Sequence, residues 1–385
     1  MIDPGGWTLD AGTQTAGPYL SARQSFRDVA QKLGGKLSAH PLRARGPNDV
    51  ELAIDMAYFG PPRARALLVV SSGIHGVEGL FGSALQVQFA RSALGQAEIL
   101  GPSGVLLIHA LNPYGFAWLR RANEDNVDLN RNFLLPGEDC QGTSETYAAL
   151  NRLLNPSGCP PRFDAAFGIR LLAKVLRRGI PALKAAVACG QYDYPAGLFF
   201  GGRNPSETLR ILERALPTML SGTERVLHLD LHTGLGPAGR CTLLAEGCTG
   251  QPGLLQSLAA RSPAAGFQAL DSRRGVAYAV RGGLGKWLLE RFQDREYHFA
   301  GLETGTYGVF RVLSALRAEN RAYHSCPDRR HPAFERAQRR LVEVFAPASG
   351  TWRRQALASG LEVLTSALGV VRESATRWEW AAKRA

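Results

Sequence analysis

Short apolar runs alternate with segments of helical periodicity along most of the chain. The apolar runs are rich in β-branched residues and are bounded by Gly or Pro, as buried strands are. We expect strands at residues 51–58, 65–71, 104–110, 225–232, 241–245 and 297–303. Between the runs, apolar positions recur every three or four residues, as on one face of a helix. We expect helices at residues 22–34, 79–94, 144–154, 163–188, 205–216, 284–292 and 309–322.

The repeated order of strand and helix predicts an α/β fold with helices on both faces of one sheet. Continuous apolar runs such as Leu67–Val70 are typical of central parallel strands, which are buried on both sides. Residues 332–385 indicate two more helices, separated around Pro347–Gly350. Because no repeat or flexible linker divides the chain, we expect one domain over residues 1–346 and a helical tail over 347–385 that packs on it.

Composition and charge narrow the class of protein. Hydrophobic residues make up 45% of the 385 and charged residues 20%, which excludes a disordered, collagen-like or coiled-coil chain. The formal net charge is +12, and all but six of the 45 basic residues are Arg. A dedicated nucleic-acid-binding protein gathers its charge on one helix or stripe. Here the densest runs, Arg329–His331 and Arg336–Arg340, are short and lack aromatic residues, so we expect solvated helix faces and no nucleic-acid partner.

Six widely spaced cysteines form no Cys-x-x-Cys pair, which is typical of free thiols in a reducing compartment. The closest pair, Cys241 and Cys248, has a spacing that a hairpin bridge also allows, but we expect free thiols. The N-terminus lacks the basic region and apolar core of a signal peptide, and no run of about 18 apolar residues occurs. We therefore expect a cytoplasmic protein with no membrane partner.

In a parallel α/β sheet, ligands bind beyond the carboxyl ends of the strands. The end of the 65–71 strand is followed by His75 and Glu78, with Gly73, Gly76 and Gly79 around them. At the start of a helix, a spacing of three puts both side chains on one face, and glycines let the backbone turn them toward one point. Imidazole and carboxylate together bind Zn²⁺. The alternative interpretation is a histidine cap beside a surface glutamate.

The end of the 225–232 strand carries a second group of polar residues. Strand periodicity puts His228, Asp230 and His232 on one face and the intervening leucines on the other. His232 lies at the carboxyl end, where it would complete two His and one Glu and leave a fourth metal position for water, as in hydrolytic zinc sites. His228 lies deeper in the sheet, so we expect it to be a hydrogen-bonded core histidine.

Glu303 ends the 297–303 strand. A carboxylate beside a metal-bound water can accept the proton of that water and pass it to a leaving amine. The alternative interpretation is a glutamate in a Gly-rich turn.

The polar segment 120–131 contains well-separated arginines and follows the 104–110 strand. The planar guanidinium matches carboxylates and oxyanions with two parallel hydrogen bonds. One arginine could polarise a scissile carbonyl while another grips a substrate carboxylate, with Asp128 and Asn130 to orient them. The alternative interpretation is a surface loop rich in Arg and Asn.

Taken together and in this order, these segments resemble the zinc carboxypeptidase superfamily, which includes metallocarboxypeptidases and the aspartoacylase and succinylglutamate desuccinylase amidohydrolases. The resemblance covers roughly residues 65–310, and its most specific parts are His75-x-x-Glu78, Val127-Asp-Leu-Asn-Arg-Asn-Phe133 and Asp230-Leu-His232. It implies a three-layer α/β sandwich around a central mixed, mostly parallel sheet of about eight strands. On this resemblance residues 1–346 would be the catalytic domain.

The resemblance also implies one catalytic Zn²⁺. His75, Glu78 and His232 would be the metal ligands. Asp128 would hold the ring of His75 in one tautomer, and Glu303 would be the general base and acid.

Two further tasks follow from the resemblance. Arg121 would stabilise the oxyanion, with Arg120 a close competitor for that role. Asn130 and Arg131 would clamp a carboxylate of the substrate.

The sequence also departs from the peptidases of the superfamily. Thr233-Gly234 follows His232, and Thr-Gly follows Glu303, which favours the deacylase-like branch. Residues 190–202 match neither branch, so the chain resembles an uncharacterised one. No tyrosine can be carried over from the resemblance, and the candidates are Tyr192, Tyr194, Tyr278 and Tyr307.

We therefore expect a zinc-dependent hydrolase that cleaves an amide or peptide bond in a small substrate with a free carboxylate. The substrate is a peptide or an N-acyl amino acid, and the residues do not decide between them or fix the oligomeric state. The retention of all three ligands together with Glu303 argues against a non-catalytic zinc-binding module.

Overall fold

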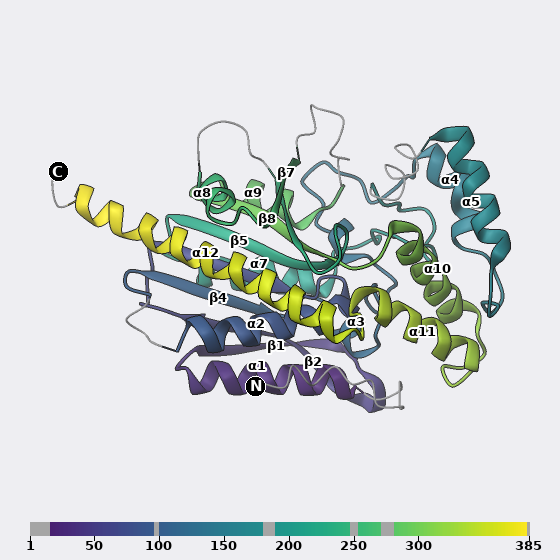
Figure 1. The fold of residues 1–385 in the computed structure, drawn as a ribbon, viewed down its shortest axis with the longest axis horizontal. Helices are drawn as coiled ribbons and strands as arrows, with labels where there is room; N and C mark the ends of the chain where they lie inside the picture. Colours follow the sequence, from purple (N-terminus) through teal and green to yellow (C-terminus); the bar gives the residue numbers. More distant parts are fainter. Residues whose placement is uncertain (1–15, 96–99, 180–188, 247–252, 271–280, 383–385) are drawn as a thin grey trace.

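The computed structural model describes residues 16–95, 100–179, 189–246, 253–270 and 281–382. Its centre is one eight-stranded sheet in the order β1-β2-β4-β3-β5-β8-β6-β7 (Figure 1). The strands are β1 (Lys36–Arg45), β2 (Glu51–Phe59), β3 (Ala66–Ser72), β4 (Ser103–His109), β5 (Arg225–Gly234), β6 (Cys241–Glu246), β7 (Gly266–Leu270) and β8 (Glu296–Gly305).

The sheet is mixed, with its parallel strands in the middle. β4, β3, β5 and β8 run parallel to one another, and β2 and β6 join them antiparallel on either side. β1 pairs antiparallel with β2, and β7 pairs parallel with β6. Every residue of β3 is buried, as its continuous apolar run predicts. The predicted α/β fold with a mixed, mostly parallel sheet is confirmed.

Successive strand residues point to opposite faces of the sheet and enter two separate cores. In β3, Leu67 and Val69 belong to one core, and Leu68 and Val70 belong to the other. The second core is covered by α1 (Gly17–Lys32), α2 (Gly79–Ala93), α8 (Leu254–Arg261) and α12 (Gly350–Ala382).

The first core has its own set of helices, to which α1 also contributes. They are α3 (Pro113–Ala117), α4 (Glu145–Leu154), α5 (Ala165–Arg178), α7 (Glu207–Met219), α9 (Leu284–Arg291), α10 (Val309–Ser325) and α11 (Pro332–Phe345). In Figure 1, α4 and α5 lie beside α10, at the end of the molecule away from the C-terminus. Three short 3₁₀ turns complete the described elements: η1 (Pro47–Asp49), η2 (Gly76–Glu78) and η4 (Leu129–Arg131).

The six predicted strands are all present, but two strands were missed. Most residues of β1 are at least partly exposed, and it lies at the edge of the sheet, so it lacks an apolar run. β7 is the other edge and has only five residues. The short helices α3 and α8 were also missed.

The predicted helix at 163–188 is interrupted at Gly179. In the structure α5 ends at Arg178, and Gly179 follows it with a φ of +78°, a left-handed conformation that glycine adopts at helix ends. The remainder of the predicted helix, residues 180–188, lies outside the described residues.

The C-terminal segment folds as the two predicted helices, α11 and α12, with the break at Pro347–Gly350. α12 lies along the sheet and contacts α2, α8 and β3 (Figure 1). Its buried residues include Trp352, whose indole N–H donates to the carbonyl of Gly305 (2.8 Å). The division into a catalytic domain over 1–346 and a tail over 347–385 stays a prediction. Among the helices that the structure describes, none has both the length and the apolar character needed to cross a membrane.

Candidate metal centre

Three neighbouring strand ends bring the candidate residues together. β3, β5 and β8 are adjacent and parallel, so their carboxyl ends meet at one edge of the sheet. His75 and Glu78 follow β3, His232 lies near the end of β5, and Glu303 on β8 is its register partner.

The turn after β3 fixes the direction of His75 and Glu78. Gly76 has a φ of +36°, and a Cβ there would collide with the carbonyl of Arg120 and the backbone of Gly115. The N–H of Val77 donates to the same Arg120 carbonyl (2.8 Å). Only glycine fits this close approach, which holds the 3₁₀ turn carrying Glu78 against the 120–131 segment.

His75, Glu78 and His232 are all buried and form one cluster. Each offers a ligand atom, and these atoms lie within 4.8 Å of one another. Nδ1 of His232 is 3.5 Å from Oε2 of Glu78, and the two imidazole rings are 5.2 Å apart between centroids. Two imidazoles and one carboxylate that converge in this way fit a zinc ion.

A carboxylate also stands beside the second nitrogen of each histidine. Oδ2 of Asp230 lies 2.7 Å from Nε2 of His232, and Oδ1 of Asp128 lies 3.2 Å from Nδ1 of His75. Such carboxylates fix the tautomer and orientation of metal-binding histidines. The position of Asp128 beside His75 is the one that the resemblance implies.

The charges around the cluster set the protonation of its members. Burial and the Arg121 guanidinium lower the pKa of His75. Burial also lowers the pKa of His232, but Asp230 and Glu78 outweigh it and hold the pKa well above its usual value. Burial raises the pKa of Asp128, yet Arg121 and His75 bring it well below its usual value.

The two candidate arginines, Arg120 and Arg121, have different hydrogen-bond partners. Arg121 donates to Oε1 of Glu78 (3.2 Å), to Oδ2 of Asp128 (3.1 Å) and to Nε2 of His75 (2.9 Å). Arg120 is 1% exposed and donates instead to Oε1 of Glu319 on α10 (2.7 Å). Arg121 is therefore the arginine at the cluster.

Glu303 lies beside the cluster with one unsatisfied oxygen. Its Oε2 is buried and has no hydrogen-bond partner among the described residues. Burial raises the pKa of Glu303 to about 7; His232 opposes this rise and Glu78 adds to it. A carboxyl group with this pKa can both accept and donate a proton near neutral pH.

Asn130 and Arg131 occupy the 3₁₀ turn η4, next to Asp128. Oδ1 of Asn130 accepts the N–H of Leu284 at the start of α9 (2.9 Å). Nη1 of Arg131 donates to the carbonyl of Asn130 (2.6 Å), while its buried Nε has no partner among the described residues. Arg131 therefore has one buried donor that is not satisfied by the described residues.

Residues 190–202, which match neither branch of the superfamily, are hydrogen-bonded to the segment that carries Asp128 and Arg131. The N–H of Asp128 donates to the carbonyl of Phe200 (2.8 Å), and Nδ2 of Asn132 donates to the carbonyl of Gly201 (2.8 Å). The hydroxyl of Tyr192 donates to the carbonyl of Arg131 (2.6 Å). This role depends on contacts between distant segments, so no pattern along the chain indicated it.

The tyrosine candidates have different surroundings. Tyr192 lies behind Arg131, as described above. Tyr194 stacks on Tyr147, with 6.0 Å between ring centroids, and the hydroxyl of Tyr307 donates to Glu343 (2.5 Å). Tyr278 lies outside the described residues.

Sequence reasoning missed Ser71, the residue before the last of β3. Its hydroxyl lies 2.8 Å from Nε2 of His228 and donates to Oδ1 of Asp230 (2.5 Å). Nδ1 of His228 lies 2.9 Å from the hydroxyl of Tyr297, so His228 is the hydrogen-bonded core histidine that we expected. A serine at the end of a continuous apolar run was the available signal.

The site is thus a candidate metal centre at the carboxyl edge of an α/β sheet. The chain belongs to the family described as DUF2817, a protein family of unknown function, whose model matches residues 16–359. No curated protein matches the sequence of the chain.

Three solved structures illustrate what the chain is similar to. Bovine thrombin-activatable fibrinolysis inhibitor, in complex with tick carboxypeptidase inhibitor, is 9% identical over 92% of this chain and 97% of its own, with a TM-score of 0.47. A metallo-carboxypeptidase from Burkholderia cenocepacia is 10% identical over 92% and 69%, with a TM-score of 0.45. Carboxypeptidase A from Helicoverpa armigera is 12% identical over 89% and 73%, with a TM-score of 0.44.

Proposed function

We propose that this protein is a zinc-dependent hydrolase that cleaves an amide or peptide bond in a substrate bearing a free carboxylate. The observation that carries the proposal is the buried cluster of His75, Glu78 and His232 with Glu303 beside it. Structural metal sites are closed by four protein ligands, whereas three ligands leave a position for water or substrate.

His75, Glu78 and His232 would hold the zinc. When bound there, zinc would act as a Lewis acid toward water and the substrate carbonyl. Asp128 and Asp230 keep the two imidazoles in the tautomers that leave the metal-facing nitrogens unprotonated.

Glu303 moves the proton in the proposed reaction. Its carboxylate accepts a proton from the attacking water and then donates it to the nitrogen of the leaving amine. Arg121 supplies positive charge to the oxyanion that forms on the former carbonyl oxygen.

Arg131, together with Asn130, selects the substrate. The buried guanidinium with an unpaired Nε is suited to a carboxylate, because an arginine fork binds both carboxylate oxygens. Both a peptide with a free C-terminus and an N-acyl amino acid present this group next to the scissile bond.

The first test combines metal analysis with a substrate screen. The purified protein should contain zinc by elemental analysis and should hydrolyse one of two series, C-terminally free peptides or N-acylated amino acids. Blocking the substrate carboxylate as an amide should abolish hydrolysis. A zinc-loaded protein that cleaves neither series would contradict the proposal and favour a non-catalytic zinc-binding module.

The variant Glu303→Gln tests the assignment of the base. It should keep its zinc and lose activity by about 10²–10⁴-fold, because only the proton acceptor is removed. His75→Ala is the matched variant that should lose zinc as well as activity. An active, zinc-loaded Glu303→Gln protein would overturn the role of Glu303.

A further inference from the structure

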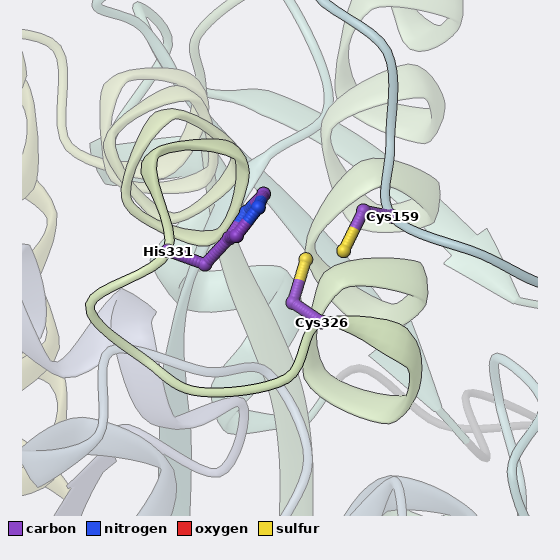
Figure 2. A group of neighbouring side chains, drawn as sticks. All are labelled: Cys159, Cys326 and His331. Carbon is purple, nitrogen blue, oxygen red and sulfur yellow. The ribbon is translucent and has the colours of Figure 1, made fainter.

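A second group of metal-binding side chains lies away from the site described above. Cys159 lies in the connection between α4 and α5, Cys326 caps the C-terminal end of α10, and His331 caps the N-terminal end of α11. Each offers one ligand atom, and the three atoms lie within 4.8 Å of one another. Figure 2 shows the two sulfur atoms pointing toward each other, with the imidazole of His331 next to Cys326.

The spacing suits one ion. Zinc lies about 2.3 Å from thiolate sulfur and about 2.0–2.1 Å from imidazole nitrogen, in tetrahedral geometry. The edges of that tetrahedron are shorter than 4.8 Å, so the three side chains need only a small contraction to share an ion.

Contacts on both sides of Cys159 hold its backbone against α10. Nε of Arg321 donates to the carbonyl of Gly158 (2.5 Å), and Nη1 of Arg317 donates to Oδ2 of Asp164 (2.6 Å). The thiol of Cys159 points to the carbonyl of Ser325, 3.6 Å away. The contacts of Gly158 and Asp164 therefore hold Cys159 close to Cys326 without a disulfide bond between the two thiols.

The loop between α10 and α11 orders His331 in a similar way. The N–H of His331 donates to the carbonyl of Asp328 (3.3 Å), and Nδ1 of the imidazole accepts the N–H of Ala333 (3.2 Å). This hydrogen bond is at the long end of the range for N–H donors, so it is weak. Its loss would cost little energy if the imidazole rotated to bind an ion.

The chemistry of the three ligands selects the kind of ion. Two thiolates and one imidazole are soft to borderline ligands, which bind Zn²⁺ and exclude Mg²⁺ and Ca²⁺. The two thiolates neutralise the charge of a divalent ion. All three residues are partly exposed, so an ion can reach them from solvent.

We propose that Cys159, Cys326 and His331 form a second zinc site, with water as the fourth ligand. The ion joins the connection between α4 and α5 to the α10–α11 hairpin. It is independent of the zinc proposed for hydrolysis, since none of its ligands belongs to that cluster.

The number of zinc ions per chain tests the proposal. The protein purified with a non-chelating reductant should hold two zinc ions, and Cys159→Ser combined with Cys326→Ser should lower the number to one. Cys140→Ser, which removes a free thiol outside the group, is the matched control and should leave two. The double variant His75→Ala, His232→Ala should retain one zinc ion. Adding Cys159→Ser and Cys326→Ser to it should remove that ion.

Cobalt gives a direct readout of thiolate binding. Co²⁺ added to the His75→Ala, His232→Ala protein should produce a near-ultraviolet thiolate-to-metal charge-transfer band. His331→Asn keeps a residue that caps helices, so it serves as the folded variant, and its affinity for Co²⁺ should fall at least tenfold.

Three outcomes would overturn the second site. One is a zinc count that the two cysteine changes do not lower. Another is a protein with no thiolate-to-cobalt band. The third is a Cys159–Cys326 disulfide, found by mass spectrometry of the protein isolated without reductant and stable in the presence of zinc. Loss of hydrolysis alone leaves the zinc count unchanged, so the two proposals fail separately.

Discussion

Arg120 and Arg121 are neighbours in the chain with different surroundings. The guanidinium of Arg121 touches His75, Glu78 and Asp128 at the candidate metal centre. That of Arg120 lies over the ring of Tyr323, 3.2 Å from its centroid, and pairs with Glu319. The backbone of this turn therefore directs the side chain of Arg121 to the site and that of Arg120 into the interior.

Arg121→Lys should lower kcat by about 10²–10³-fold with little change in KM. Lysine keeps the positive charge, but a single ammonium group cannot reproduce the planar set of donors that faces the oxyanion. Steady-state kinetics on the substrate found in the screen measures both constants.

Arg120→Lys is the matched comparison, and it should lower stability without lowering kcat. It removes donors from the buried carboxylate of Glu319 and the side chain of Asn126, so the free energy of unfolding should fall by about 1–3 kcal/mol. The kcat of the folded fraction should be retained. A loss of kcat in Arg120→Lys but not in Arg121→Lys would exchange the two roles.

At the residue scale, strand ends predicted the convergence of His75, Glu78, His232 and Glu303, because parallel neighbours share an edge. The resemblance favoured Arg121 but left Arg120 a close competitor, because the choice depends on the direction of a turn held by Gly76. Ser71 was missed because one hydroxyl does not interrupt an apolar run.

At the scale of elements, α12 shows how a terminal segment becomes part of the core. It places Val363, Leu364, Leu368 and Val371 in the same core as Leu68 and Val70 of β3. Apolar periodicity predicted the helix, but only the structure gives the face of the sheet that it covers. The edge strands β1 and β7 were missed because an edge strand needs no continuous apolar run.

Leu364→Ala should lower the free energy of unfolding by about 2–5 kcal/mol. Leu364 is fully buried, and its removal leaves a cavity between α12 and the sheet. Urea denaturation measures the effect, and Glu362→Ala, an exposed change on the same helix, should stay within about 0.5 kcal/mol of the parent. Equal midpoints for both variants would show that α12 does not stabilise the sheet.

At the scale of the whole molecule, the excess of arginine has a partly structural explanation. Several guanidinium groups donate to backbone carbonyls that end elements, as Arg295 does to Leu220 (2.6 Å) and Arg317 does to Leu153 (2.6 Å). A net charge of +12 therefore requires no polyanionic partner to account for it. The cytoplasmic location and the lack of nucleic-acid and membrane partners stay predictions from the sequence.

The contribution of His109 to the stability of the molecule should fall as the pH drops below about 6.5. Burial lowers the pKa of His109 from 6.5 to about 4, so between these values the unfolded chain binds a proton that the folded chain does not. The loss from this residue is about 2 kcal/mol at pH 5, relative to pH 8. His109→Gln should reduce the difference in the free energy of unfolding between pH 8 and pH 5 by about that amount in urea titrations. If His109→Gln leaves this pH-dependent difference in the free energy of unfolding unchanged, the effect does not come from His109.

The order of the strands also bears on how the chain folds. Residues 66–305 contribute the three adjacent strands β3, β5 and β8, so the candidate site exists only after contacts between distant segments have formed. Such contacts form slowly, because a long loop must close before they stabilise the chain. Zinc would therefore bind a late, nearly native species and would slow unfolding more than it speeds folding. A fragment that ends before β8 would lack both Glu303 and the strand that supports His232.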